Sequence, residues 1–138
     1  MFTSKKKINF YDCDPAGIFF YGKVYELCHS AYEDLIASFN LDHDYWRNED
    51  YVVPIIQSAA SYHKPIKYGE LINVEIIVSQ LKLSSFELQY DCKNEKGENC
   101  TKVKTVHVFI DKKSWKKKEM RKEIYNSFSK YIYKEIKT

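Results

Sequence analysis

Ten residues near the N-terminus combine the groups that acyl transfer requires. The segment precedes a stretch with helical periodicity and reads Asp12-Cys13-Asp14-Pro15-Ala16-Gly17-Ile18-Phe19-Phe20-Tyr21. The first N–H groups of a helix have no acceptor within the helix and carry partial positive charge, so they stabilise an oxygen that becomes negative during a reaction. A carboxylate held beside them, such as that of Asp14, deprotonates water or attacks a carbonyl. The pattern therefore predicts an acyl-transfer site.

The same segment has a second interpretation, in which its carboxylates only close a loop. Pro15 favours an extended conformation at Asp14, and Gly17 permits backbone angles that other residues avoid. Such an ordered, irregular loop commonly uses Asp side chains as acceptors for nearby backbone N–H groups. Local chemistry alone leaves both interpretations open for Asp12 and Asp14.

The elements that would position this loop are predicted from hydrophobic periodicity. Alternation at Ile8 and Phe10 favours a first strand over residues 3–11. Apolar residues then recur at steps of three and four from about Tyr21 to Phe39, which predicts one long helix. Residues 41–50 are polar enough to form a loop.

Beyond this loop the period changes to two, which indicates a run of strands. They are expected within residues 53–62, 72–78, 86–92 and 106–110. A terminal amphipathic helix should carry one apolar stripe of Met120, Ile124, Phe128 and Ile132. This order predicts an α+β fold in which an antiparallel sheet curves around the first helix. The length, 138 residues, fits a single domain over residues 1–138.

Composition limits the other classes of function. The four cysteines include no Cys-x-x-Cys pair, and no Cys and His residues have zinc-like spacing, so we expect neither a bound metal nor a redox cofactor. No apolar segment of signal-peptide or membrane length follows the basic N-terminus, which favours a cytoplasmic protein without membrane insertion.

Residues 112–138 hold 10 Lys and Arg against 3 Asp and Glu. Such a basic end can meet nucleic acid, an anionic membrane or a phosphorylated ligand, but a solvated helix face is the commonest outcome, and we expect no nucleic-acid partner.

The loop motif resembles that of the 4-hydroxybenzoyl-CoA thioesterase family, whose members have the hotdog fold. The resemblance continues through Pro54-Ile55-Ile56, Ala60-Ser61-Tyr62 and the segment from Pro65 to Glu70. It implies hydrolysis of an acyl-CoA or aroyl-CoA thioester, with Asp14 as nucleophile or general base. It also implies that the N–H of Tyr21 polarises the thioester carbonyl, that Gly17 lies against the substrate and that Asp12 is structural.

Two further predictions concern the substrate contacts and the number of subunits. Lys112 and Lys113 are candidates for binding the coenzyme A phosphates, because ammonium groups bind phosphate as mobile point charges, and a solvated turn is the alternative. Hotdog sheets that resemble this one join edge to edge, which implies a homodimer or homotetramer with the active site between subunits.

Three departures from the family pattern leave the acyl group open. Lys23 stands where an Asn is common, Glu70 stands where an Asp is usual, and the helix lacks an Arg that many members have. The helix segment from Leu27 to Glu33 instead resembles the branch that hydrolyses 1,4-dihydroxy-2-naphthoyl-CoA.

Two other functions are alternatives to thioester hydrolysis. One is a dehydratase or hydratase that acts on acyl carrier protein and pairs His63 with a carboxylate. The other is a non-catalytic acyl-binding module, since fold does not fix function. Glu26 and Glu33 on the helix are secondary catalytic candidates, although solvent or interface roles suit them better.

Overall fold

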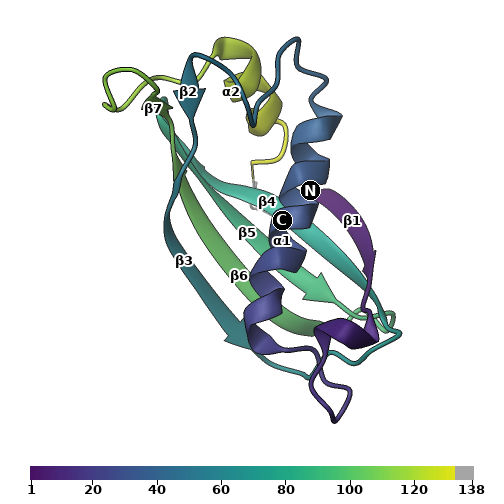
Figure 1. Ribbon diagram of the computed structural model, residues 1–138. Helices are drawn as coiled ribbons and strands as arrows, with labels where there is room; N and C mark the ends of the chain where they lie inside the picture. Colours follow the sequence, from purple (N-terminus) through teal and green to yellow (C-terminus); the bar gives the residue numbers. More distant parts are fainter. Residues whose placement is uncertain (133–138) are drawn as a thin grey trace, which may run out of the picture.

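The computed structural model describes residues 1–132, and one antiparallel sheet and one long helix dominate it (Figure 1). The last six residues of the predicted domain lie outside the described residues. The sheet has the strand order β1-β4-β5-β6-β3, and a separate two-stranded ribbon pairs β2 with β7. In chain order the strands are β1 (Phe2–Lys7), β2 (Tyr51–Val52), β3 (Ile55–Tyr62), β4 (Leu71–Leu81), β5 (Ser85–Lys93), β6 (Asn99–Val108) and β7 (Ile110–Asp111). The helices are η1 (Phe10–Asp12), η2 (Tyr21–Lys23), α1 (Val24–Ser38) and α2 (Lys122–Ser129), where η denotes a 3-10 helix.

Helix α1 lies against one face of the sheet, which curves around it (Figure 1). Its buried residues recur at helical spacing and are Val24, Leu27, Cys28, Ala31, Tyr32, Leu35 and Ile36. The sheet meets them with the alternating side chains of β4 and β5, which include the fully buried Ile72, Val74, Ile76 and Leu88. The predicted α+β fold, with a sheet wrapped around a long helix, is confirmed.

The first strand is shorter than predicted, because its partner strand ends. β1 pairs with β4 from Phe2 opposite Ile76 to Lys7 opposite Leu71, the first residue of β4. Ile8 remains buried, but the chain then turns into η1 and leaves Phe10 exposed. The alternation of Ile8 and Phe10 therefore does not reflect a strand, and its extension to Tyr11 was wrong.

Two helix boundaries also differ from the prediction. The periodic stretch from Tyr21 begins with the 3-10 turn η2, and the α-helix starts at Val24. In the terminal stripe only Ile124 and Phe128 lie within α2. Met120 precedes the helix, and Ile132 follows it and forms a bridge with Val78 of the sheet. Burial against one core, and not a shared helix, produces this stripe.

Strand β3 forms an open edge of the sheet. Its only strand partner within residues 1–132 is β6. Along β3 nearly every residue is exposed, including the large apolar side chains of Ile55, Ile56 and Tyr62. An edge of this kind has a row of N–H and C=O groups free to pair with another chain.

His107 on β6 is a polar residue enclosed in the core. Its ring stacks on Phe86 with centroids 4.5 Å apart and is fully buried. Nε2 lies 2.7 Å from Thr105 Oγ1, whereas Nδ1 has no partner within residues 1–132. Burial, and secondarily the nearby His29, lowers the pKa of His107 to about 3. The imidazole is therefore neutral in the folded protein at all but strongly acidic pH.

This burial predicts a loss of stability in mild acid. Because the unfolded chain binds a proton at His107 below about pH 6.5 and the folded chain does not, stability should fall as pH decreases from 6.5 towards 3. At pH 4 the loss should amount to roughly 3 kcal/mol of unfolding free energy. Urea denaturation at pH 7 and pH 4 would measure it. The stability of His107→Gln should depend less on pH, whereas that of His63→Gln, which changes an exposed histidine, should depend on pH as in wild type. An equal change in unfolding free energy between pH 7 and pH 4 for wild type and His107→Gln would contradict the prediction.

Candidate active site

The irregular loop between η1 and η2 lies at the end of the sheet where α1 begins (Figure 1). Asp14 is part of this loop. Its Oδ1 accepts hydrogen bonds from the N–H groups of Ala16, at 2.9 Å, and Ile18, at 3.1 Å. Its backbone N–H donates to the carbonyl of Ile18, and its own carbonyl accepts from Gly17. Oδ2 has no hydrogen-bond partner within residues 1–132. Asp14 thus closes the loop with one oxygen and leaves the other available for chemistry.

Gly17 is required by both the backbone angles and the packing of this loop. Its φ is +78°, and a Cβ at this position would lie 3.0 Å from Cδ1 of Tyr68. The N–H of Tyr68 donates to the Gly17 carbonyl at 3.0 Å, and Phe19 N–H donates to the Ile66 carbonyl at 2.7 Å. Residues 66–68, at the exit from β3, therefore hold the Asp14 loop in place.

Tyr21 begins the 3-10 turn that leads into α1. Within residues 1–132 the N–H groups of Tyr21 and Gly22 have no acceptor, as expected for the first residues of a helix. The preceding peptide is tied down, because Phe20 N–H donates to the Asp12 carbonyl at 3.0 Å. Free N–H groups and a free carboxylate oxygen are therefore only a few residues apart in the chain.

A cavity of about 350 Å³ opens between the helix start and the end of β3. Its walls are mostly apolar and are formed by Ile18, Phe19, Tyr21, Val24, Tyr62, His63, Lys64, Pro65, Ile66 and Thr101. Asp14 does not line this cavity, but Ile18, whose N–H it holds, does. The loop motif and the apolar hollow are therefore adjacent.

Asp12 makes contacts that differ from those of Asp14. Its Oδ1 lies 3.8 Å from Nζ of Lys23, which also contacts Oε2 of Glu26 at 3.3 Å. The lysine that departs from the family pattern thus joins the loop to the first turn of α1. These contacts agree with a structural role for Asp12.

The basic segment lies at the opposite end of the sheet, beyond β7 (Figure 1). Lys112 and Lys113 are exposed, and Nζ of Lys112 donates to the Asn48 carbonyl at 2.8 Å. Lys118 instead pairs with Asp50 and Asp111, and this contact lowers the pKa of Asp50. Within one chain the structure does not bring Lys112 and Lys113 to Asp14, and Lys118 is engaged in holding the loop before β2.

The remaining acidic and basic candidates have ordinary surroundings. Glu33 lies on the exposed side of α1 with Oε2 3.9 Å from Nδ1 of His29, and Glu26 contacts Lys23. His63 lines the cavity, but it has no ion-pair partner within residues 1–132. None of the described helices is long and apolar enough to cross a membrane.

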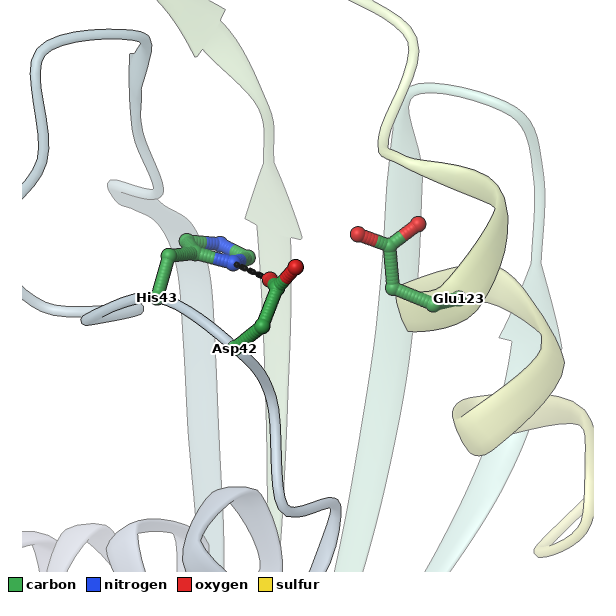
Figure 2. A group of neighbouring side chains, drawn as sticks. All are labelled: Asp42, His43 and Glu123. Carbon is green, nitrogen blue, oxygen red and sulfur yellow. Dashed lines mark hydrogen bonds and ion pairs between the residues drawn. The ribbon is translucent and has the colours of Figure 1, made fainter.

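One group of three possible metal ligands was not foreseen from the sequence. Asp42 and His43 on the loop after α1 face Glu123 of α2, with ligand atoms within 4.8 Å of one another (Figure 2). Both ring nitrogens of His43 already have partners, since Nδ1 lies 3.1 Å from Asp42 and Nε2 lies 2.6 Å from the hydroxyl of Tyr51. A cation would have to displace the Asp42 contact. The sequence contains no signal for this group, because Glu123 is 80 positions away from His43.

Comparison with known proteins identifies the family of this chain. The family model of the thioesterase-like superfamily matches residues 8–128, which include the Asp14 loop and the whole curved sheet apart from β1. The chain belongs to this superfamily.

Individual proteins are similar to this chain over most of their length. A 1,4-dihydroxy-2-naphthoyl-CoA hydrolase of Nostoc punctiforme is 30% identical over 125 residues, which cover 89% of this chain and 83% of that protein. The enzyme of the same name from Thermosynechococcus vestitus is 30% identical over 107 residues, covering 77% and 73%. The crystal structure of a 1,4-dihydroxy-2-naphthoyl-CoA thioesterase from Synechocystis superposes with a TM-score of 0.86 at 21% identity, covering 93% of this chain and 95% of that one.

Proposed function

We propose that this protein hydrolyses an acyl or aroyl thioester of coenzyme A, with Asp14 as the reacting carboxylate. The observation that carries the proposal is the difference between the two carboxylate oxygens of Asp14: Oδ1 accepts hydrogen bonds from two N–H groups, whereas Oδ2 has no partner within residues 1–132. Membership of the thioesterase-like superfamily supports the reaction type. Similarity to 1,4-dihydroxy-2-naphthoyl-CoA hydrolases, together with the aromatic side chains of Tyr21 and Tyr62 at the cavity, favours an aromatic acyl group.

Two routes lead to the same products. As a general base, Oδ2 of Asp14 removes a proton from water while the water oxygen bonds to the thioester carbon, and the C–S bond of the tetrahedral intermediate then breaks to release the coenzyme A thiolate. As a nucleophile, Oδ2 itself bonds to that carbon, the coenzyme A thiolate leaves, and water then hydrolyses the anhydride. In both routes the carbonyl oxygen becomes negative, and the free N–H of Tyr21 stabilises it by hydrogen bonding. The products are the free acid and coenzyme A, whose thiolate takes up the proton.

Asp14→Asn tests the role of the carboxylate. The Asn carbonyl oxygen still accepts the bonds from Ala16 and Ile18, so the loop should persist, but the charge needed by a base or nucleophile is lost. We expect kcat for an aroyl-CoA substrate to fall at least about 100-fold. Thiol release measures kcat, and thermal melting checks the fold.

Asp12→Asn and Glu33→Gln are the matched controls, and both should retain most of the activity. Full activity in a folded Asp14→Asn protein would exclude the proposed mechanism. The dehydratase alternative has less support, because His63 is not paired with a carboxylate within residues 1–132.

We further propose that two chains pair along β3 to form a homodimer, or a homotetramer built from it. The exposed edge of β3 has free backbone groups and the apolar side chains of Ile55 and Ile56. Pairing would satisfy the first and bury the second.

Light scattering should therefore give two or four times the 16.4 kDa of one chain. Ile56→Lys should shift the mass towards that of a monomer, because a charge would be buried in the interface. Leu83→Lys is a matched control, since Leu83 is also 59% exposed but lies on the hairpin between β4 and β5. A monomeric wild type at micromolar concentration would contradict the proposal.

Antiparallel pairing of two β3 edges would also explain the distant basic segment. It places the Ile55 end of one β3 beside the Tyr62 end of the other. The start of β3 adjoins the β2–β7 ribbon and hence Lys112 and Lys113, whereas its end lines the cavity beside the Asp14 loop. We therefore propose that Lys112 and Lys113 of one subunit contact the coenzyme A phosphates bound at the partner's site.

The double variant Lys112→Gln, Lys113→Gln tests this contact. It should raise KM for coenzyme A thioesters about 10-fold with little change in kcat, because phosphate binding is the same in the ground and transition states. High salt should reduce the difference from wild type, since exposed charges are screened over about 8–10 Å at moderate ionic strength. Lys5→Gln, Lys7→Gln changes the same charge on β1 and should leave KM unaltered. An unchanged KM in the first variant would contradict the phosphate contact and indicate that Lys112 and Lys113 are only solvated surface residues.

A further inference from the structure

A hydrogen bond between distant parts of the chain holds the start of the helix. The hydroxyl of Tyr62, the last residue of β3, donates to the carbonyl of Tyr21 at 2.9 Å. The two residues are 41 positions apart, and their rings also meet edge to face with centroids 6.4 Å apart. Both residues line the cavity beside the Asp14 loop.

The Tyr21 carbonyl receives two donors in this arrangement. One is the N–H of Val24, which closes the 3-10 turn, and the other is the Tyr62 hydroxyl. The first bond is internal to the turn and moves with it, whereas the second ties the turn to the sheet. The Tyr21 carbonyl and the Tyr21 N–H belong to successive peptide planes that share one Cα. Holding the carbonyl against β3 therefore restricts the direction of the N–H.

The hydroxyl is well suited to act as a permanent donor. A tyrosine phenol is protonated at neutral pH, and the pKa of Tyr62 is raised further, chiefly by partial desolvation and then by the neighbouring Tyr25 and Tyr21. A protonated phenol can donate one hydrogen bond, and the Tyr21 carbonyl accepts it.

We propose that Tyr62 is a positioning residue for thioester hydrolysis, acting through the Tyr21 backbone. Its hydrogen bond aligns the Tyr21 N–H with the carbonyl oxygen of the substrate as that oxygen becomes negative. A donor stabilises this charge only when it is oriented before the reaction, and small misplacements reduce the rate. This inference rests on the proposed thioesterase function.

Tyr62→Phe removes the hydroxyl and keeps the ring that packs against Tyr21. Loss of one neutral hydrogen bond should lower kcat for an aroyl-CoA thioester about 3- to 10-fold, with KM changed less than about 2-fold. Melting temperature and the mass by light scattering should match those of wild type. Tyr11→Phe is the matched control, because its exposed hydroxyl accepts a bond from the neighbouring Asn9 side chain and has no other partner within residues 1–132, and it should leave both constants unchanged.

The split between kcat and KM separates the possible roles of Tyr62. An unchanged kcat in Tyr62→Phe would overturn the proposal, and so would a raised KM with normal kcat, which would place the hydroxyl in contact with the acyl group. Asp14→Asn, assayed in parallel, identifies which hypothesis has failed. An active Asp14→Asn refutes the proposed mechanism as a whole, whereas an inactive Asp14→Asn beside a normal Tyr62→Phe refutes only the positioning role.

Discussion

The burial of α1 against the concave face of the sheet is the contact on which the rest of the structure depends. An antiparallel sheet with one apolar face must cover that face, and a single long amphipathic helix does so here. Because α1 starts at one end of the sheet, the loop before it is held against the exit from β3 through Phe19 and Ile66. The position of the candidate site is therefore a consequence of core packing.

The contacts of Asp14 leave room for both a structural role and the proposed chemical role. The two interpretations of its carboxylate, loop closure and catalysis, use different oxygen atoms. Binding of Oδ1 by two backbone N–H groups limits the rotation of the side chain. A carboxylate oriented in this way loses less freedom on reaching its reactive position than a mobile one would. Loop closure would therefore prepare Asp14 for the proposed reaction.

Within one chain, the parts of the proposed site lie at opposite ends of the sheet. The Asp14 loop lies where α1 begins, while the basic segment beyond β7 lies where α1 ends (Figure 1). The cavity adjoins the Asp14 loop at Ile18. The open edge of β3 runs between these ends and has the free backbone groups that a second chain would pair with. The proposed twofold arrangement along that edge would join the two halves of the site, so oligomerisation would have a functional reason.

Local patterns in the sequence were enough to predict the helix and strands whose side chains contact the core at regular intervals. The three- and four-residue spacing from Val24 to Ile36 and the alternation from Ile72 to Val78 both correspond to buried faces, because each face must meet the same core. The sharp turn at Gly17 could also be predicted from the sequence, because glycine, which has no side chain, readily adopts the positive φ found there.

Tertiary structure decided whatever depends on a partner distant in the chain. β1 ends at Lys7 because β4 begins opposite it, and the alternation of Ile8 and Phe10 carried no information about that limit. Lys118 could not be distinguished from Lys112 by composition, yet only Lys118 meets both Asp50 and Asp111. The bond from Tyr62 to the Tyr21 carbonyl joins a strand end to a helix start, and a backbone acceptor leaves no signature in the amino-acid sequence.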